Sequence, residues 1–155
     1  MEAVIFAGIQ GSGKSTFFQK RFASTHAHIN LDTLKTRQRE MRVLQECLEQ
    51  GKDFVVDNTN PTPEERRRYL EPARAAGYIL KGYFFDVPIA DCIERNKTRE
   101  GKSRIPIPGL YATRKKMKPP SYDEGFHELF LVAAAGKEFA VTPLPRGSSG
   151  EQRPY

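Results

Sequence analysis

The chain has 155 residues, 38% of them hydrophobic, and a formal net charge of +6. This length suits one domain with a single core, and no apolar run approaches the ~20 residues that a membrane helix needs. We expect no secretion signal, and the two cysteines, Cys47 and Cys92, lie among apolar residues, as buried thiols of a reducing cytoplasm do. These totals exclude a membrane-spanning protein and a disulfide-stabilised scaffold, and we expect a cytoplasmic protein.

Short apolar runs alternate with amphipathic segments along the chain. We expect strands over residues 3–7, 28–31, 53–56, 78–85 and 128–132, a helix that begins near residue 15, and further helices over 33–50, 63–76, 88–99 and 109–117. This alternation predicts an α/β fold, with a central parallel sheet of about five strands flanked by helices. Residues 143–155 contain few large apolar side chains, so we expect a folded domain over 1–142 and a flexible tail over 143–155.

A glycine-rich loop follows the first predicted strand, with the pattern Gly8-x-x-x-x-Gly13-Lys14-Ser15. Glycine permits positive φ, so backbone N–H groups can close around phosphate oxygens at the positive end of a helix. A strand before this pattern and a helix after it predict a nucleoside triphosphate site, with Lys14 at the β- and γ-phosphates and the Ser15 hydroxyl on Mg²⁺. The residues predicted to bind ATP in this loop are Gly8, Gln10, Gly11, Ser12, Gly13, Lys14, Ser15 and Thr16.

Asp32 follows the second predicted strand, in the stretch H-I-N-L-D-T. The carboxyl ends of parallel strands converge on the ligand crevice, where a carboxylate can take a proton from an attacking hydroxyl. Asp32 is therefore a candidate catalytic base and, with Ser15, a candidate magnesium ligand. The alternative is an N-cap for a helix that begins at Thr33, because that position also favours aspartate.

The third predicted strand runs into V-V-D-N-T-N-P, which clusters polar side chains at its end. An apolar strand followed by Asp57 resembles a magnesium-organising segment. Asn58, Thr59 and Asn60 offer hydrogen bonds on the acceptor side. The same residue types are ordinary choices for a turn before a helix that starts with proline, so this alternative stays open.

Positive charge is concentrated between residues 94 and 118, where nine basic residues stand against two acidic ones and give a net +7. Arg95 and Arg99 lie one helical turn apart, before a loop that contains Gly101, Lys102 and Arg104. A mobile arginine lid of this kind can neutralise charge on a transferred phosphoryl group. The segment indicates an anionic ligand, with a solvated basic face as the alternative.

The ordered motifs resemble the kinase domain of the polynucleotide 5′-kinase family over residues 4–132. The resemblance is carried by G-x-x-G-S-G-K-S-T-F, H-I-N-x-D-T-L, D-N-T-N-P, R-N-x-x-R-E and Y-A-T-R-K-K-M-K-P-P-S-Y-D-E-G-F. It implies a P-loop kinase fold with an arginine-bearing lid, ATP as phosphate donor, Mg²⁺ as cofactor and a nucleic acid 5′-hydroxyl as acceptor. By this resemblance Asp32 is the general base and Arg99 covers the ATP phosphates, with Lys14 and Arg95 beside them.

Two positions depart from the family pattern on the acceptor side. Leu31 stands where the family often has arginine, and Lys35 stands where the phage-type enzyme has an arginine that contacts the acceptor strand. The predicted acceptor residues are therefore Asp32, Lys35, Asn58, Thr59 and Asn60, with weakened or redirected recognition. The D-x-D-G-T motif of the partner phosphatase is absent from this sequence, so we expect no removal of 3′ phosphates by this chain.

Three functions remain open from the sequence. The first is a polynucleotide 5′-kinase, the second a kinase of a nucleoside, sugar acid or antibiotic, and the third a regulatory module that hydrolyses ATP slowly. The basic segment favours the first over the second, because a polymer needs phosphate contacts beyond the reacting one. A base at Asp32 disfavours the third. The run Arg66-Arg67-Arg68 follows two glutamates on a predicted helix, where we expect a solvated face.

Overall fold

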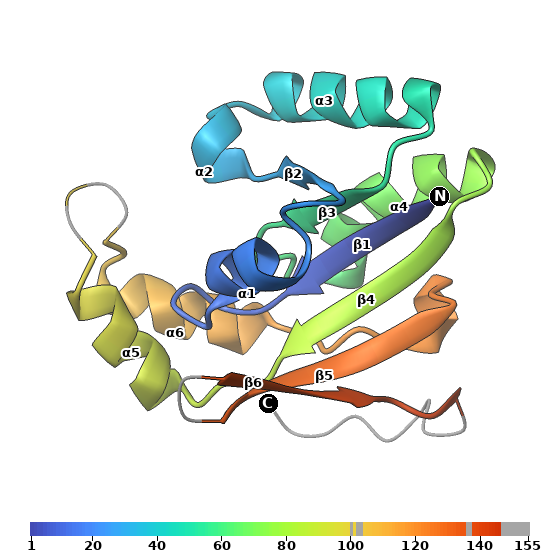
Figure 1. Ribbon diagram of the computed structural model, residues 1–155. Helices are drawn as coiled ribbons and strands as arrows, with labels where there is room; N and C mark the ends of the chain where they lie inside the picture. The colour runs from blue at the N-terminus through green and yellow to red at the C-terminus, as the bar shows by residue number, and fades with distance from the viewer. Residues whose placement is uncertain (100, 102–103, 136–137, 147–155) are drawn as a thin grey trace.

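The computed structural model of the protein describes residues 1–99, 101, 104–135 and 138–146. Its centre is a six-stranded sheet in the order β2-β3-β1-β4-β5-β6 (Figure 1). The strands are β1 (Glu2–Ala7), β2 (Ala27–Ile29), β3 (Phe54–Asp57), β4 (Ile79–Phe85), β5 (Glu128–Ala135) and β6 (Glu138–Pro143). Every neighbouring pair is parallel except β5 and β6, so the predicted α/β fold is confirmed.

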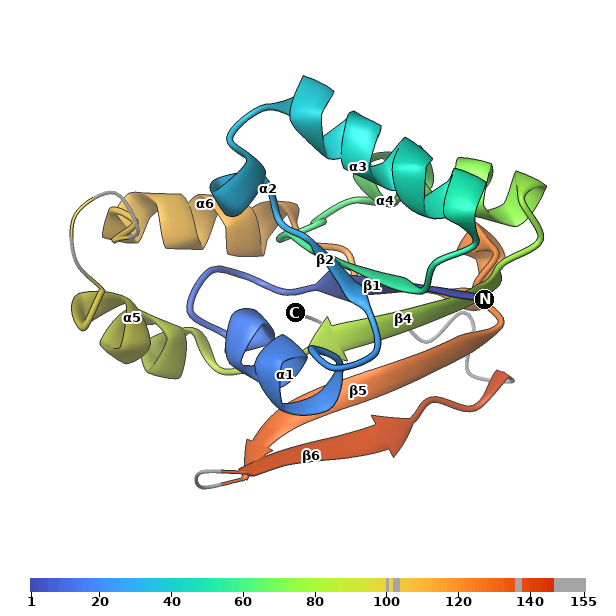
Figure 2. The same ribbon diagram turned by 45° about the horizontal axis from the view of Figure 1, so that its top comes forward.

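Helices cover both faces of the sheet, as Figure 2 shows. They are α1 (Lys14–Arg21), α2 (Leu31–Leu34), α3 (Arg37–Gln50), α4 (Pro63–Ala75), α5 (Ile89–Lys97) and α6 (Ile107–Lys116), with a short 3₁₀ helix η2 (Tyr122–Glu124). None of the helices in the described part of the chain combines the length and apolarity that spanning a membrane requires.

Strand β1 is the centre of the core because its alternate residues point to opposite faces. Ala3 and Ile5 are buried in the cluster that α3 and α4 complete, whereas Val4 and Phe6 are buried against the aromatic side chains of α1. Both faces of β1 are thus apolar, which explains the continuous hydrophobic run in its sequence. Residues 3–7 of β1 are fully buried, so the loop that follows begins at a well-packed strand end.

Strand β6 is an element that the sequence reasoning missed. It pairs antiparallel with β5 over residues 130–135 and 138–143, and most of its side chains are exposed or half-buried. Only Phe139 and Val141 pack against the core, so β6 carries little apolar signal. Within the predicted tail, Leu144 still donates a backbone hydrogen bond to Leu129, at 2.8 Å. Residues 147–155, most of that tail, lie outside the described residues.

The helix predicted over residues 33–50 is broken into α2 and α3. Lys35 takes a positive φ of 74° at the break, and the Thr36 side chain caps α3 by accepting a hydrogen bond from the Arg39 amide. The N-cap of α2 is Asn30, whose side chain accepts from the Thr33 amide at 3.1 Å. The alternative that made Asp32 an N-cap is therefore wrong, because Asp32 lies inside the first turn.

Candidate functional site

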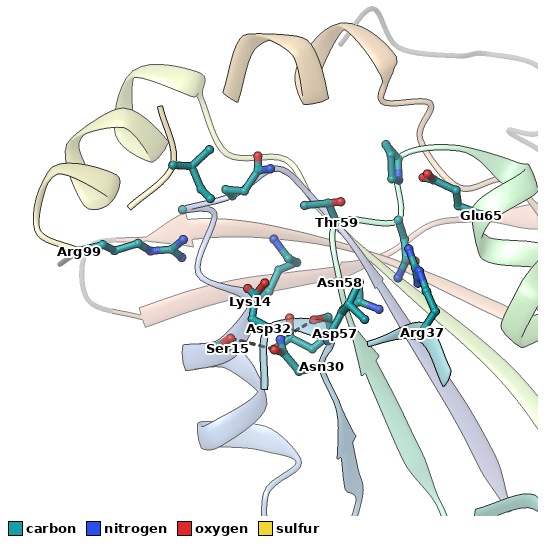
Figure 3. Close-up of a pocket in the computed structure, with 16 residues that line it drawn as sticks. Lys14, Ser15, Asn30, Asp32, Arg37, Asp57, Asn58, Thr59, Glu65 and Arg99 are labelled. Atoms are coloured by element: carbon teal, nitrogen blue, oxygen red, sulfur yellow. Dashed lines mark hydrogen bonds between the residues drawn. The ribbon is translucent and has the colours of Figure 1, made fainter. Parts of the chain in front are cut away.

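A pocket opens at the carboxyl ends of β1, β2 and β3, beside the phosphate loop (Figure 3). In an open parallel sheet this is the edge where ligands bind. The lining residues come from the phosphate loop, α2, the loop after β3, the start of α3 and α4, and the lid: Gln10, Gly11, Lys14, Ser15, Asn30, Leu31, Asp32, Arg37, Asp57, Asn58, Thr59, Asn60, Pro61, Glu65, Arg99 and Ile105. Most of the predicted site residues are thus brought together in one cavity.

The phosphate loop depends on glycine at two positions with positive φ. Gly11 has φ 80°, and a Cβ there would lie 2.5 Å from the Cys92 carbonyl oxygen. Gly13 has φ 95° and caps α1, and a Cβ there would lie 2.6 Å from Arg95 Nη1. A side chain at Gly11 would therefore clash with the backbone of α5, and one at Gly13 would displace the Arg95 side chain, so the loop and α5 lie in close contact.

Lys14 is a buried cation at the centre of the pocket. Its Nζ donates hydrogen bonds to the carbonyl oxygens of Gly8 and Ile9, both at 2.9 Å. Burial lowers the pKa of Lys14 to about 8, and the nearby Asp57 carboxylate opposes this shift. The buried ammonium has lost its water and is hydrogen-bonded to uncharged carbonyl oxygens. A negatively charged phosphate would stabilise it further, as the loop pattern predicts.

The predicted metal site has a different carboxylate beside Ser15. Ser15 Oγ donates to Asp57 Oδ2 at 2.8 Å, and His28 Nε2 lies 2.8 Å from the same oxygen. Asp57 is only 2% exposed, and the His28 ring is stacked on Phe18 with centroids 3.9 Å apart. A serine hydroxyl and a carboxylate are hard oxygen donors that fit Mg²⁺. Among the described residues, Ser15 and Asp57 form this pair, whereas Asp32 lines the cavity nearby.

Two asparagines hold the short helix that carries Asp32. Asn30 Nδ2 donates to the Asp57 carbonyl at 2.7 Å while its Oδ1 caps Thr33, and Asn58 Oδ1 accepts from the Leu31 amide at 2.9 Å. A four-residue helix has no stability of its own. The end of β3 therefore holds α2 in place, and the Asp32 side chain is exposed at the pocket wall.

The predicted acceptor residues are used in different ways. Asn58 Nδ2 donates to Glu40 Oε2 at 2.7 Å, and Asn60 Nδ2 donates to the Phe6 carbonyl at 2.8 Å, so both amides are engaged inside the protein. Thr59 lines the cavity and its carbonyl accepts from the Gly8 amide at 3.0 Å. Lys35 is exposed and is not among the lining residues.

Of the two arginines predicted to form a lid, Arg99 lies at the other end of the pocket from Asn58, and Arg95 is not among the lining residues. Arg99 lines the cavity, and Figure 3 shows its side chain extended toward the phosphate loop. Arg95 lies against Gly13. The buried Asn96 closes the base of the loop that follows, because its amide pairs with both the nitrogen (2.9 Å) and the carbonyl oxygen (2.5 Å) of Ile105. Arg104 is exposed, and the predicted lid residue Lys102 lies outside the described residues.

Arg37 is a pocket residue that the sequence reasoning missed. Its Nη1 donates to Glu40 Oε1 at 2.9 Å and to the Tyr69 hydroxyl at 2.8 Å, and the rest of the guanidinium borders the cavity. A signal was present in the sequence. Glu40 falls on the inward face of α3 with Leu44 and Cys47, and a carboxylate at such a position requires a cationic or hydrogen-bonding partner nearby.

The predicted solvated face at Arg66-Arg67-Arg68 is wrong for Arg66. Arg66 is fully buried, and its guanidinium forms two hydrogen bonds to the Glu124 carboxylate, at 2.7 and 2.9 Å, and one to the Asn60 carbonyl, at 2.7 Å. Glu124 belongs to the E-G-F turn, so Arg66 joins that turn to the D-N-T-N-P loop. The two motifs are more than 60 residues apart in the sequence but belong to one structural unit.

Comparison with solved structures shows the same fold in other proteins. A gluconokinase from Sinorhizobium meliloti 1021 superposes with a TM-score of 0.60 at 20% identity, over 87% of this chain and 83% of that one. Kti12 from Chaetomium thermophilum in complex with ADP-AlF3 superposes with a TM-score of 0.62 at 17% identity, over 84% of this chain and 88% of that one. These similarities confirm the predicted P-loop kinase fold.

Sequence comparison points to polynucleotide kinases. A bifunctional polynucleotide phosphatase/kinase from Schizosaccharomyces pombe is 27% identical in an alignment 139 residues long, which covers 81% of this chain and 32% of that protein. A putative bifunctional polynucleotide phosphatase/kinase from Acanthamoeba polyphaga mimivirus is 30% identical in an alignment 141 residues long, which covers 84% of this chain and 33% of that protein. The chain spans about a third of the length of these relatives, and the predicted resemblance is confirmed. The AAA domain model matches residues 30–120, and the chain therefore belongs to the AAA domain family.

Proposed function

We propose that the protein is an ATP- and magnesium-dependent kinase that phosphorylates the 5′-hydroxyl end of DNA or RNA. The observation that carries this proposal is the arrangement of one pocket (Figure 3). Lys14 and Arg99 supply positive charge on one side, Asp32 supplies a carboxylate between the two sides, and Arg37 supplies a further cation on the far wall. Such a pocket suits a triphosphate that meets a hydroxyl belonging to another anionic molecule.

The donor side holds the ATP phosphates. The loop from Gly8 to Thr16 presents backbone N–H groups to them, and Lys14 exchanges its carbonyl partners for the β- and γ-phosphates. Arg95 and Arg99 neutralise charge on the γ-phosphoryl oxygens. Ser15 and Asp57 would hold Mg²⁺, which when bound offsets negative charge on the phosphates.

The acceptor side activates the hydroxyl. Asp32 accepts the hydroxyl proton as that oxygen forms its bond to the γ-phosphorus. The bond from the γ-phosphorus to the bridging oxygen of ADP breaks, and ADP leaves with those electrons. The Asp32 carboxylate is exposed on α2 at the pocket wall, so a hydroxyl that enters the pocket can contact it directly.

Arg37 supports an anionic acceptor. The phage-type arginine is replaced by Lys35, which does not line the pocket, but Arg37 brings a guanidinium to the same wall from the start of α3. A planar guanidinium matches a phosphate group with two parallel hydrogen bonds. An acceptor that carries a phosphate beside its 5′-terminal nucleoside would form these hydrogen bonds with Arg37.

A small polyol is the second candidate acceptor, and one observation favours it. Glu65 lines the pocket, and its Oε2 is buried without a hydrogen-bond partner among the described residues. A carboxylate accepts hydrogen bonds from hydroxyl groups and repels phosphate, so this wall also suits a sugar acid with several hydroxyls.

Transfer of labelled γ-phosphate to 5′-hydroxyl oligonucleotides, nucleosides and gluconate, in parallel, tests the two candidates. We expect oligonucleotides to be phosphorylated, and their KM to rise steeply with salt. For a single strand, log affinity plotted against log salt concentration should have a slope of about −0.7 per phosphate contact. Arg37→Ala should raise the oligonucleotide KM about tenfold or more with little effect on the ATP KM. Arg42→Ala is the matched control, because Arg42 is exposed on the same helix outside the pocket.

Phosphorylation of gluconate or a nucleoside in preference to every oligonucleotide would contradict the polynucleotide proposal. An oligonucleotide KM that is indifferent both to salt and to Arg37→Ala would do the same. In either case Glu65 becomes the residue to study, because the polyol candidate depends on its carboxylate.

A further inference from the structure

A cluster of polar side chains runs from the acceptor wall of the pocket to two fully buried groups, Glu40 and Tyr69, and the proposed reaction does not use the cluster as a whole. It consists of Arg37, Glu40, Asn58 and Tyr69, which come from α3, the loop after β3 and α4. The Tyr69 hydroxyl donates to Glu40 Oε1 at 2.8 Å and accepts from Arg37 at 2.8 Å and from Asn58 at 3.1 Å. Glu40 Oε2 accepts from Asn58 at 2.7 Å.

Burial makes this cluster demanding. Glu40 and Tyr69 are both fully buried, and a carboxylate in the core is costly unless each oxygen has a partner. Both Glu40 oxygens have such partners, so the carboxylate is satisfied in this arrangement. Burial, together with the Glu40 charge, raises the pKa of Tyr69, so its hydroxyl stays protonated and keeps donating.

The cluster reaches the pocket at two points. Arg37 lines the cavity directly, with Nη1 held on Glu40 and Tyr69. Asn58 turns its Oδ1 toward α2 and accepts from the amide of Leu31, the residue before Asp32. The cation of the acceptor wall and the turn that carries the carboxylate are thus connected to the same buried hydroxyl.

We propose that Tyr69 and Glu40 are positioning residues of the acceptor site, which set Arg37 and the Asp32 turn in register with each other. The proposal rests on the proposed function of this pocket. Neither residue contacts substrate. The Tyr69 hydroxyl bonds to both Arg37 and Asn58. Its loss should therefore make the Arg37 side chain and the Asp32 turn more mobile and leave the phosphate loop in place.

The test compares two conservative variants, Tyr69→Phe and Tyr78→Phe. Tyr78 is the matched control because it is also a buried tyrosine whose hydroxyl forms two hydrogen bonds, to the carbonyls of Cys47 and Lys52, both at 2.9 Å. It packs in the core away from the pocket lining. Steady-state kinetics with oligonucleotide and ATP are measured for each variant, and amide exchange at Leu31 is measured by NMR without any substrate.

We expect Tyr69→Phe to lower kcat/KM for the oligonucleotide roughly tenfold and to keep the ATP KM within about twofold. Exchange of the Leu31 amide should become roughly tenfold faster. Tyr78→Phe should lower the melting temperature and leave the oligonucleotide kcat/KM and the Leu31 amide unchanged. Glu40→Gln keeps the shape of the side chain but replaces one acceptor oxygen with an N–H donor and removes the charge that holds Arg37. We therefore expect a higher oligonucleotide KM and an unchanged ATP KM.

Identical behaviour of Tyr69→Phe and Tyr78→Phe at Leu31 and in the oligonucleotide kinetics would overturn the proposal. Should the wild-type protein phosphorylate no oligonucleotide, the proposed function fails, and the Leu31 exchange alone then decides about the cluster. Faster exchange in Tyr69→Phe only would support it, and unchanged exchange would overturn it.

Discussion

The buried ammonium of Lys14 makes ATP use depend on pH in a way that can be calculated. Its pKa is about 8 in the folded protein, against an ordinary value of 10.5. With a pKa of 8, roughly nine tenths of the free protein carries the charge at pH 7, and only about one tenth does so at pH 9. Because the charged form binds phosphate, we expect kcat/KM for ATP to fall about tenfold between these pH values. The fall in kcat should come at higher pH, since bound phosphate favours the charged form.

Folding stability should respond to the same group in the opposite direction. Between pH 8 and 10.5 the unfolded chain keeps the Lys14 proton and the folded protein does not, so this group makes the folded state more stable as pH rises, by up to roughly 3 kcal/mol. Its destabilising effect is fully present below pH 8. Lys14→Met should remove this stability trend, so the difference in unfolding free energy between wild type and the variant isolates Lys14 from the buried cysteines and tyrosines. A kcat/KM for ATP that stays level from pH 7 to 9.5 would show that ATP binding does not depend on a Lys14 ammonium with this lowered pKa.

Two substitutions test other parts of the site. Asp32→Asn keeps the shape of the side chain but cannot accept a proton, so we expect kcat to fall about 10²-fold or more with an unchanged melting temperature; retention of most of the activity in the transfer assay would place the base elsewhere. Arg66→Met leaves the Glu124 carboxylate without its partner in a nearly buried position, so we expect a loss of about 3–5 kcal/mol of stability, a drop of roughly 10 °C or more in melting temperature. Calorimetry should show that Arg66→Met combined with Glu124→Leu recovers much of this loss, and a double variant no more stable than the single one would argue against the buried pair.

The parts of the fold that local sequence specifies were predictable. The phosphate loop depends on glycines at neighbouring positions, and β1 and β3 are continuous apolar runs, so both could be located from the sequence. The break at Lys35 could not, because a lysine with positive φ carries no glycine signal. Strand β6 exposes most of its side chains, and its hydrogen-bonded partner, rather than its composition, defines it.

Site residues within short motifs could be predicted from the sequence. Hydrogen-bond partners that lie far apart in the sequence could not. Asn58 and Asn60 fall at the predicted place, but their amides are bonded to Glu40 and Phe6, which sequence spacing does not reveal. Arg66 was misjudged because its partner Glu124 lies 58 residues further along the chain. Charged residues are usually exposed, so a buried pair is visible only once both elements are placed.

The hydrogen bond from the Gly8 amide to the Thr59 carbonyl joins the first residue of the phosphate loop to the loop on the acceptor side. A movement of Gly8 on phosphate binding would alter this hydrogen bond and with it the position of Thr59, and a movement of Thr59 would in turn alter the position of Gly8. Two substrates that share such a contact cannot bind independently if either one displaces it. If binding of one substrate changes the affinity for the other by some factor, binding of the second must change the affinity for the first by the same factor.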